Sequence, residues 1–568
     1  LNDAELDLVT ASPLQVGAAA AGAVTMSADV TPSGVTNLHI LSGSTVTGTA
    51  GGVIATGLAV TAGGIVNITD PQTNVTNLAI DTSTGNVTFT EADGLTVATV
   101  DSVVDIDTDN GDVSLTATTG SLSLNTINAT GTVTLAADAG SITDTNDATN
   151  TYNNNVTATT LVASAQDLVG NANHNILLNP GGTGFDALET AVTNLTVTTT
   201  AANADVAIDN TKGSTLTVDA VTPSTGQDAT MWVRNDNGVT VTAWTLDGND
   251  NVALLATAGN VTFPDGGAGV IDTSGNLVTP DISVGTGKVR LEAAAGLVQD
   301  SASRALVIAA SDLVVKSNTL NNETTGFAVG NFAATPVELA VLLSGKLDVD
   351  INSDAQNLRI LGANSGGLSE DLKIGDVDSD TYSMTTNGTA SLGELTVTVL
   401  NGTSATTDDT DDSNSPTLAI YNTLNTDNAN INLNVLGLNV TAGDNSQADG
   451  SIQILSGATV QTDATNDQLG TTSLTGDVKI IGQVFANSGE TILITGPSDN
   501  ITIDPTGVAG SGVLTLIPGT GKNVDFQPGA NVSVVSGGGN SGSLVIKNAA
   551  NVVMDPTATV VVDGSVDI

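Results

Sequence analysis

The chain has no cysteine, very few aromatic residues and few basic residues. Among its 568 residues, aromatics make up 2%, and 12 Lys and Arg stand against 60 Asp and Glu. Without cysteine there is no disulfide, zinc–thiolate site or thiol nucleophile. The shortage of Phe, Trp and Tyr argues against a two-sheet sandwich with an aromatic centre. It favours a narrow core filled by stacked aliphatic side chains.

The excess of acidic residues gives a net charge of −48. A polyanion repels phosphate backbones and anionic lipid surfaces, so we expect no nucleic-acid partner. Two interpretations of the charge remain open. It keeps molecules soluble and apart, or divalent cations and salt neutralise it and bridge neighbouring molecules.

Long apolar stretches are also missing, since none approaches the roughly 18 residues that cross a bilayer. We therefore expect no membrane span. The acidic residues that follow Leu1 do not form a basic secretion leader, and we expect a chain processed or cut from a longer precursor.

Residues suited to catalysis are scarce. A Ser-His-Asp triad would have to use His39 or His174, and no nucleophile elbow is recognisable. Trp232, Arg234 and Trp244 form the one cluster worth considering as a sugar-stacking patch, but ordinary packing or cover for the end of a coil is the favoured interpretation. We expect that the chain is not an enzyme.

What the sequence does contain is a repeated phrase. Four copies of a glycine followed by alternating apolar and mostly hydroxyl residues begin at Gly111, Gly120, Gly131 and Gly140. Every second glycine recurs after 20 residues, and each copy has the pattern of a turn followed by a strand. A repeat this short cannot bury a core alone and must stack on its own copies.

The predicted fold class is therefore all-β, a parallel β-helix (β-solenoid), right-handed, with loop insertions. Spacings of 26 residues, such as Gly85 to Gly111, indicate the same coil with a modest inserted loop. At most one short helix is expected near 336–344, where Thr335-Pro336-Val337-Glu338 forms a capping box and Gly345 follows.

The domain organisation is expected to be simple. Residues 1–22 are predicted to be a lead-in or capping segment, and residues 23–568 the β-solenoid. Polar breaks near 144–156 and 406–415 are predicted to be surface loops within it.

The sequence resembles the filamentous-haemagglutinin-type proteins, a family of bacterial β-strand-repeat surface proteins. The resemblance lies in the segment Leu1-Asn2-Asp3-Ala4-Glu5-Leu6-Asp7, the Gly-x-Val-Thr-Leu phrases and the long Thr/Asn/Gly-rich coils. It implies a secreted right-handed parallel β-helix used in adhesion and matrix building. The secretion domain that the family carries is not recognisable in this sequence.

Alternating acidic residues are candidate calcium ligands. One ladder comprises Asp105, Asp107 and Asp109 with Asp112 beyond it, and it departs from an EF-hand loop in the placement of its glycine. Like charges on one face of an extended segment are unfavourable unless they are solvated or bind a metal. An exposed acidic edge is the alternative for each ladder. The other two ladders contain Asp348, Asp350 and Asp354, and Asp376, Asp378 and Asp380.

A glycine-rich segment, residues 181–188, matches one copy of the calcium-binding nonapeptide of repeat-in-toxin proteins. Asp186 would supply its carboxylate. Such sites need consecutive copies, so a simple glycine-rich turn is the alternative. We expect no required cofactor, with Ca²⁺ as a possible ligand.

These features together predict an extracellular structural protein of a bacterial cell surface. It would be a rigid acidic solenoid that serves as an adhesin or as the repeating subunit of a fibre or biofilm matrix. We expect self-association, head-to-tail or lateral, and a glycan or other cell-surface ligand. The alternatives are an S-layer lattice subunit and a secreted polysaccharide-active β-helix enzyme.

Overall fold

Nearly every regular element of the chain, seen in a computed structural model, is a β-strand. The chain divides into two compact units, Leu1–Val261 and Thr262–Ile568. Strand pairing in the sheets of both units is parallel, which confirms the predicted parallel β-helix. The structure describes residues 3–145, 154–170, 186–222, 229–243, 246, 249–263, 270–271, 277–299, 306–317, 339–351, 358–363, 371–379, 382–386, 394–401, 417–426, 430–437, 451–455, 458–461, 471–475, 477–480, 483–486, 491–495, 501–503, 508–510, 513–517, 523–526, 528, 531–534 and 543–568.

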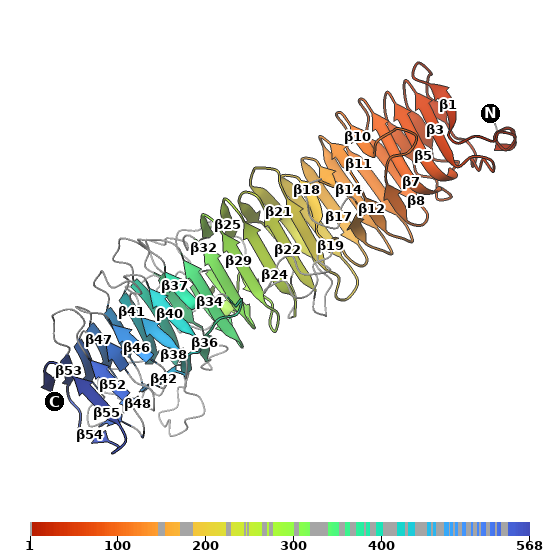
Figure 1. Cartoon of the computed structure of the whole chain (residues 1–568). Coiled ribbons are helices and arrows are strands. Elements are labelled where there is room, and N and C mark those ends of the chain that lie inside the picture. Colours follow the sequence, from red (N-terminus) through yellow and green to blue (C-terminus); the bar gives the residue numbers. More distant parts are fainter. Residues whose placement is uncertain are drawn as a thin grey trace. The chain divides into compact units, whose positions relative to one another are not determined.

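Unit 1 contains two parallel sheets, preceded by the short helix α1 (Asp3–Leu6) (Figure 1). Its first sheet consists of β1 (Leu14–Ala18), β3 (Asn37–Ser42), β5 (Ile54–Ala62), β7 (Asn74–Thr82), β9 (Leu95–Val97), β10 (Ile106–Thr108), β12 (Leu122–Leu124), β13 (Ile127–Ala129), β15 (Ile142–Asp144), β16 (Val156–Thr157), β18 (Leu188–Ala191), β20 (Val206–Asn210), β22 (Thr230–Asn235) and β24 (Asn251–Ala256). Its second sheet consists of β2 (Val24–Thr25), β4 (Val46–Gly48), β6 (Val66–Ile68), β8 (Val87–Glu91), β11 (Val113–Ala117), β14 (Thr132–Ala137), β17 (Thr160–Ala165), β19 (Asn194–Thr199), β21 (Leu216–Thr222) and β23 (Val239–Val241). Strand β25 (Asn260–Phe263) crosses the boundary between the units.

The 20-residue period of the sequence is one turn of this solenoid. The phrases at Gly111 and Gly131 form β11 and β14, which pair with Val113 opposite Val133. The phrases at Gly120 and Gly140 form β12 and β15, which pair in the first sheet. Two glycine-led phrases therefore make one coil, which adds one strand to the second sheet and the two short strands of a split pair to the first.

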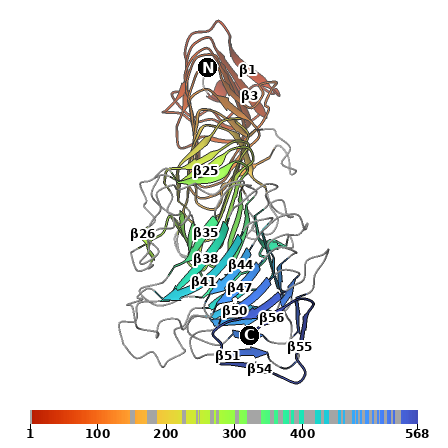
Figure 2. The same cartoon turned by 90° about the vertical axis from the view of Figure 1, so that its left-hand side faces the viewer.

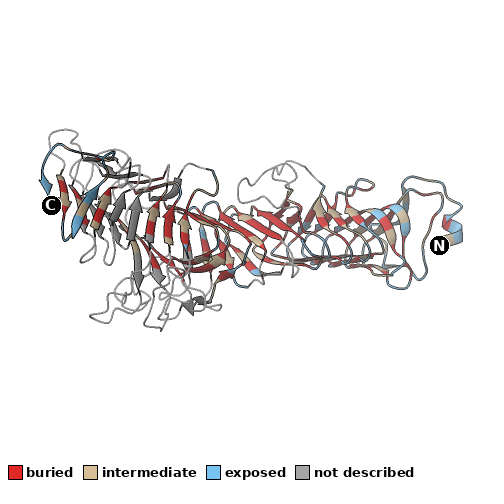
Figure 3. Cartoon of the chain, turned by 90° about the horizontal axis from the view of Figure 1, so that it is seen from below, coloured by how far each residue is buried: buried red, intermediate tan, exposed pale blue. Residues whose placement is uncertain are grey.

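Aliphatic side chains fill the space between the sheets in columns. In the second sheet, Val46, Val66, Val87, Val113 and Val133 occupy one register position in successive strands. Each of these valines is 0–1% exposed. Figure 3 shows the buried positions alternating with partly exposed ones along the strands. This arrangement confirms the narrow aliphatic core, which depends on hydrophobic stacking between coils.

After the fourth coil, the first sheet changes from one long strand per coil to two short strands per coil. Strand β7 pairs at Asn77 and Leu78 with β9, and at Ile80 to Thr82 with β10. Between β9 and β10, residues 98–105 leave the sheet, and from there β12/β13 and β15/β16 continue as split strands. This excursion accounts for the spacing of 26 residues between Gly85 and Gly111.

Unit 2 also contains two sheets of parallel strands, together with the small antiparallel pair β26 (Val270–Ile271) and β27 (Leu277–Thr279) and the strand β30 (Gly296–Gln299). Its first sheet consists of β29 (Val289–Ala293), β32 (Leu313–Ser317), β34 (Lys346–Ile351), β36 (Leu372–Ile374), β37 (Tyr382–Thr386), β39 (Thr417–Ile420), β40 (Thr423–Thr426), β42 (Ser451–Ile454), β43 (Thr459–Gln461), β45 (Asp477–Ile480), β46 (Gln483–Ala486), β48 (Ile501–Ile503), β49 (Val508–Gly510), β51 (Asn523–Phe526), β52 (Asn531–Val534), β54 (Asn551–Met554) and β55 (Thr559–Val562).

The second sheet of unit 2 lies beside the first, and several of its strands are seen side by side in Figure 2. It consists of β28 (Ile282–Ser283), β31 (Leu306–Ala310), β33 (Leu339–Leu343), β35 (Leu358–Gly362), β38 (Glu394–Asn401), β41 (Asn430–Gly437), β44 (Thr471–Thr475), β47 (Thr491–Thr495), β50 (Val513–Ile517), β53 (Ser543–Ile546) and β56 (Val566–Asp567).

The helix predicted near 336–344 is wrong over its described part, because Leu339–Leu343 forms strand β33. This run pairs with β31 and β35, and four of its five side chains are buried. A short apolar run is compatible with a buried strand as well as with a helix. Backbone pairing with β31 on one side and β35 on the other makes this run a strand. Gly345 is required by close approach, since a Cβ there would lie 2.1 Å from Asp312 Oδ1.

The predicted lead-in, residues 1–22, contains β1, the strand that pairs with β3. The polar break near 144–156 lies partly outside the described residues, and the break near 406–415 lies wholly outside them. Strands β54, β55 and β56 pair with preceding strands, and Val553, Val561 and Val566 are about half exposed, at 46–53%.

Candidate metal centre

Three carboxylates from two of the predicted ladders meet in unit 2. One oxygen from each of Asp348, Asp376 and Asp378 lies within 4.8 Å of the others. Asp348 is on β34 and is fully buried, whereas Asp376 and Asp378 belong to the turn that follows β36. Among the described residues, this is the group of acidic side chains with the closest approach to a metal-ligand arrangement.

Hydrogen bonds hold the turn against β34. The backbone N–H of Val377 donates to Asp348 Oδ2 at 2.8 Å. The backbone N–H of Ser379 donates to Asp376 Oδ1 at 2.6 Å, and Ser379 has a left-handed φ of 70°. Asp348 and Asp376 thus already serve as acceptors that fold the turn over the outer surface of the sheet.

Two basic side chains lie against the same carboxylates. Lys316 Nζ is 2.6 Å from Asp378 Oδ2 and 3.6 Å from Asp350 Oδ2. Arg290 Nη1 is 3.6 Å from Asp378 Oδ2, and Arg290 also pairs with Glu292. Glu292, Lys316 and Asp350 occupy one register row on successive strands, so negative and positive charges alternate across the coils.

The charge balance decides how the cluster is held together. Five carboxylates and two basic groups leave a formal charge of 2 − 5 = −3, from Glu292, Asp348, Asp350, Asp376 and Asp378 against Arg290 and Lys316. The carboxylates are of the type that Ca²⁺ binds. Lys316 and Arg290 already neutralise the charge of Asp378, however, so ion pairs among its own side chains hold the cluster together. The calcium prediction for these residues stays a prediction.

The first ladder does not form such a group. Asp105 is buried, and the Asn125 amide donates to both of its carboxylate oxygens at 3.1 and 2.9 Å. Asp107 and Asp109 are exposed. The predicted alternation along one face fails because Asp105 adopts a left-handed φ of 53° at the end of the excursion. Burial raises the pKa of the Asp105 carboxyl.

Asp107 lies in a different acidic row, with Asp81 opposite it on β7 and Asn128 opposite it on β13. Burial, followed by the charges of Asp107 and Asp109, raises the pKa of Asp81. Asp112 is not part of this row. Its Oδ1 accepts a hydrogen bond from the Thr132 backbone N–H at 2.8 Å.

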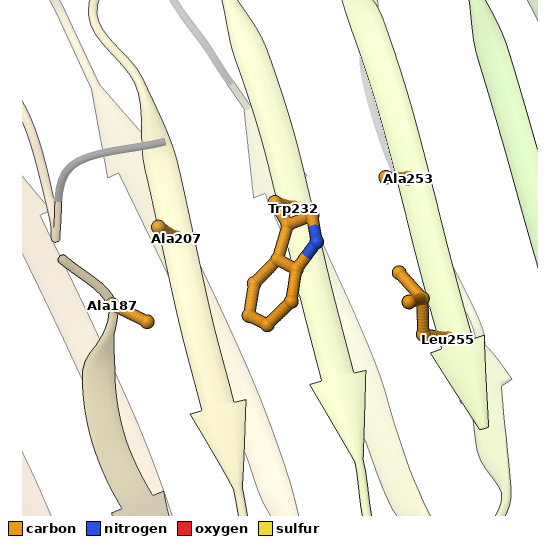
Figure 4. Packing of buried hydrophobic residues seen from close by; sticks show 5 residues of the cluster. All are labelled: Ala187, Ala207, Trp232, Ala253 and Leu255. Carbon is orange, nitrogen blue, oxygen red and sulfur yellow. The ribbon is translucent and has the colours of Figure 1, made fainter. Parts of the chain in front are cut away.

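The remaining candidates are less informative. Asp354 and Asp380 lie outside the described residues, as do residues 181–185, so residues 186–188, including Asp186, are the part of the nonapeptide match that the structure describes. Trp244 is also outside them. Trp232 is 2% exposed and packs in a cluster with Ala187, Ala207, Ala253 and Leu255 (Figure 4). Its ring is therefore buried among other side chains and is not exposed for stacking on a sugar. The neighbouring Arg234 pairs with Asp209.

A histidine site that the sequence did not predict lies on the first sheet of unit 1. His39 Nδ1 is 2.7 Å from Asp101 Oδ2, and His39 Nε2 is 3.1 Å from Thr61 Oγ1. The order hydroxyl–imidazole–carboxylate is that of a catalytic triad. However, Thr61 lies near the end of β5, where the backbone still pairs with β3 and β7, and His39 is 7% exposed. Strand β5 therefore has no free pair of backbone N–H groups that could form an oxyanion hole.

The structure instead gives His39 a role in holding the excursion. Val100 and Val103 exchange backbone hydrogen bonds of 3.0 and 2.9 Å around Asp101 and Ser102, which have left-handed φ values of 44° and 67°. The two valines pack on the outward alanines Ala59 and Ala79. Asp101 then reaches His39, so the tip of the loop is fixed by an apolar contact and a charged hydrogen bond.

The contact between His39 and Asp101 in unit 1 and the cluster of Asp348, Asp376 and Asp378 in unit 2 share one arrangement, which we name the clasp. In each unit a strand of the first sheet, β7 or β34, pairs with two short strands of the next coil. Residues 98–105 and 375–379, which lie between those short strands, fold over the outer face, and an aspartate, Asp101 or Asp378, contacts a basic or imidazole group of an earlier coil.

Comparison with protein family models, with curated proteins and with solved structures found no match. Over the part of the chain that the structure describes, no helix has the length and apolar character needed to cross a membrane.

Proposed function

We propose that this chain is a structural β-solenoid of the bacterial cell surface, of the filamentous-haemagglutinin type, acting as an adhesin or as a repeating subunit of a fibre or matrix. The observation that carries the proposal is the stacking of successive coils in register around aliphatic columns. Such a stack resists deformation and grows in one direction, which suits a spacer or a scaffold.

The placement of the reactive groups agrees with a structural role. His39, Asp101, Asp348 and Asp378 each contact other side chains or backbone groups of the fold, and these contacts fasten loops to the sheet. A structural protein uses polar groups in this way, whereas an active site leaves them facing a substrate cleft.

A second candidate function is an S-layer lattice subunit. The specific observation in its favour is the convergence of Asp348, Asp376 and Asp378, with an excess of negative charge around them. A lattice subunit would assemble in two dimensions and would require the cation.

Electron microscopy of the purified chain, with and without CaCl₂, tests these proposals. We expect elongated particles that form fibres or bundles as the concentration of protein and salt rises. An ordered sheet that appears with calcium and dissolves with a chelator would support the lattice subunit instead. Particles that stay single under every condition would contradict both forms of assembly.

A further inference from the structure

One face of unit 1 carries no charge, although the chain as a whole has a net charge of −48. The face is the outer side of the second sheet from β2 to β19. Its positions alternate with the buried ones and are partly or fully exposed. We name it the hydroxyl face, and its residues are Thr25, Thr47, Asn67, Thr88, Thr90, Ser114, Thr116, Thr132, Thr134, Ala136, Thr160, Val162, Ser164, Asn194, Thr196 and Thr198.

The side chains of this face stand in straight rows because the strands pair in register. Thr47, Asn67, Thr88, Ser114 and Thr134 occupy one position in five successive coils. A second row on the same strands places Thr90, Thr116 and Ala136 opposite one another. Side chains about 4.8 Å apart within each row present a regular array of methyl and hydroxyl groups.

Five acidic residues of the same unit lie away from this array, whereas Asp112 borders it and accepts a hydrogen bond from the Thr132 backbone N–H. Asp81 and Asp107 are on the first sheet, and Asp93, Asp109 and Asp138 are in the turns between strands. Two molecules of this charge repel one another at these acidic surfaces. The hydroxyl face itself carries no charged side chain, so a like-charged molecule approaches it at a smaller electrostatic cost than it approaches the acidic row of Asp81 and Asp107.

We propose that the hydroxyl face binds the hydroxyl face of a second copy of this chain. The inference rests on the proposed function as a self-assembling structural protein, and it assigns the surface used for lateral association. Facing sheets whose side chains stand in register rows interdigitate at a separation of about 10 Å. The threonine methyls would pack, and the hydroxyls would exchange hydrogen bonds across the contact.

The size of the face agrees with a reversible contact. Eight strands about 4.8 Å apart and about 15 Å wide give a footprint of roughly 600 Å² for each copy. The pair would bury about 1,200 Å², the lower limit for a stable protein interface. We therefore expect weak association of single molecules that strengthens with ionic strength, because salt screens the repulsion between the acidic surfaces.

Two double variants of the full chain provide a matched test. Ser114→Asp with Thr134→Asp adds two charges to the hydroxyl face at paired positions of β11 and β14. Ser123→Asp with Thr143→Asp adds the same charges, to the same residue types and in the same two coils, at paired positions of β12 and β15. All four side chains are partly exposed, so both variants should fold.

Sedimentation equilibrium in 0.02 M and 0.5 M NaCl, with and without CaCl₂, measures the association. For the wild type and the Ser123/Thr143 variant at high salt, we expect a dissociation constant on the order of 10–100 µM. The Ser114/Thr134 variant should associate at least about tenfold more weakly, because it brings four carboxylates together at the contact. Circular dichroism melting checks that both variants are folded.

The outcomes separate this inference from the proposed function. Equal association of all three proteins, or equal weakening of both variants, would overturn the hydroxyl face as the contact while leaving self-assembly intact. A wild type that stays monomeric at both salt concentrations and with calcium would overturn both.

Discussion

His39 and Asp101 are 62 residues apart in the sequence, yet His39 Nδ1 lies 2.7 Å from Asp101 Oδ2. The contact joins β3 to the tip of the excursion that interrupts the first sheet three coils further on. It holds residues 98–105 against the sheet together with the packing of Val100 and Val103 on Ala59 and Ala79.

Replacing His39 with alanine should release the excursion. The change removes a charged hydrogen bond and the bond to Thr61, and we expect a loss of about 2–3 kcal/mol in local stability. Hydrogen exchange at the amides of Val100 and Val103 would measure it. Gln15→Ala is the control, because Gln15 occupies the same register row and is exposed. Unchanged exchange at both valines would show that the apolar contact alone holds the loop.

Replacing Lys316 with methionine should make the acidic cluster dependent on calcium. The variant removes the ammonium group from Asp350 and the nearer of the two basic groups from Asp378, and we expect a loss of about 3 kcal/mol in stability. Calcium should then raise the melting temperature of the variant by more than that of the wild type, because the ion takes over the role of the ammonium group.

Lys288→Met is the control for this experiment. Lys288 pairs with Asp312 at 3.1 Å, but its side chain is 45% exposed, so the cost should be at most about 1 kcal/mol. Equal calcium responses in the wild type and in Lys316→Met would argue against a cation site at Asp348, Asp376 and Asp378.

The stability of unit 1 should fall as the pH rises, because of Glu91. Burial raises the pKa of this carboxyl from 4.5 to about 7, against the opposing effect of the Val75 backbone N–H, which donates to Glu91 Oε2 at 2.9 Å. The folded state thus binds the proton more tightly than the unfolded state. The contribution is complete below pH 4.5 and is lost as the pH rises through 7.

The variant Glu91→Gln should remove this dependence, since the amide oxygen still accepts the bond from Val75. We expect it to be about 2–3 kcal/mol more stable than the wild type at pH 8 and nearly equal to it at pH 4.5. Denaturant unfolding at the two pH values provides the measurement. A variant less stable than the wild type at pH 8 would show that the carboxylate form contributes more than its burial costs.

Replacing Trp232 with alanine should cost about 3–5 kcal/mol, because the indole is 2% exposed and fills a cluster between neighbouring strands. Trp232→Phe should cost less, since most of the volume remains. Chemical denaturation compares the two variants. If both retain full stability while glycan binding is lost, the ring serves a sugar site.

The repeat and the core were predictable because they depend on local pattern. The glycine-led phrases define strands, and their 20-residue recurrence defines which strands pair, as Val113 and Val133 show. The clasps were not predictable, because their partners come from different coils. Nothing in the sequence around Asp101 points to His39, and the second and third acidic ladders gave no sign that Asp348 would meet Asp376 and Asp378.

The error at 336–344 has the same origin. The capping box and Gly345 are local signals for a helix, but Leu339–Leu343 pairs with strands on both sides. Pairing with neighbouring coils outweighs local preference when the surrounding fold supplies a place for a strand. Sequence signals for helices are therefore weakest within a repeat that already dictates strand positions.

Because β7 and β34 each pair with two short strands separated by an excursion, the solenoid can accept extra residues within a coil and resume its register immediately afterwards. The length of such a loop is independent of the coils above and below it. Descendants of this sequence can therefore acquire new surface loops, and with them new binding specificities, while the scaffold that displays them stays the same.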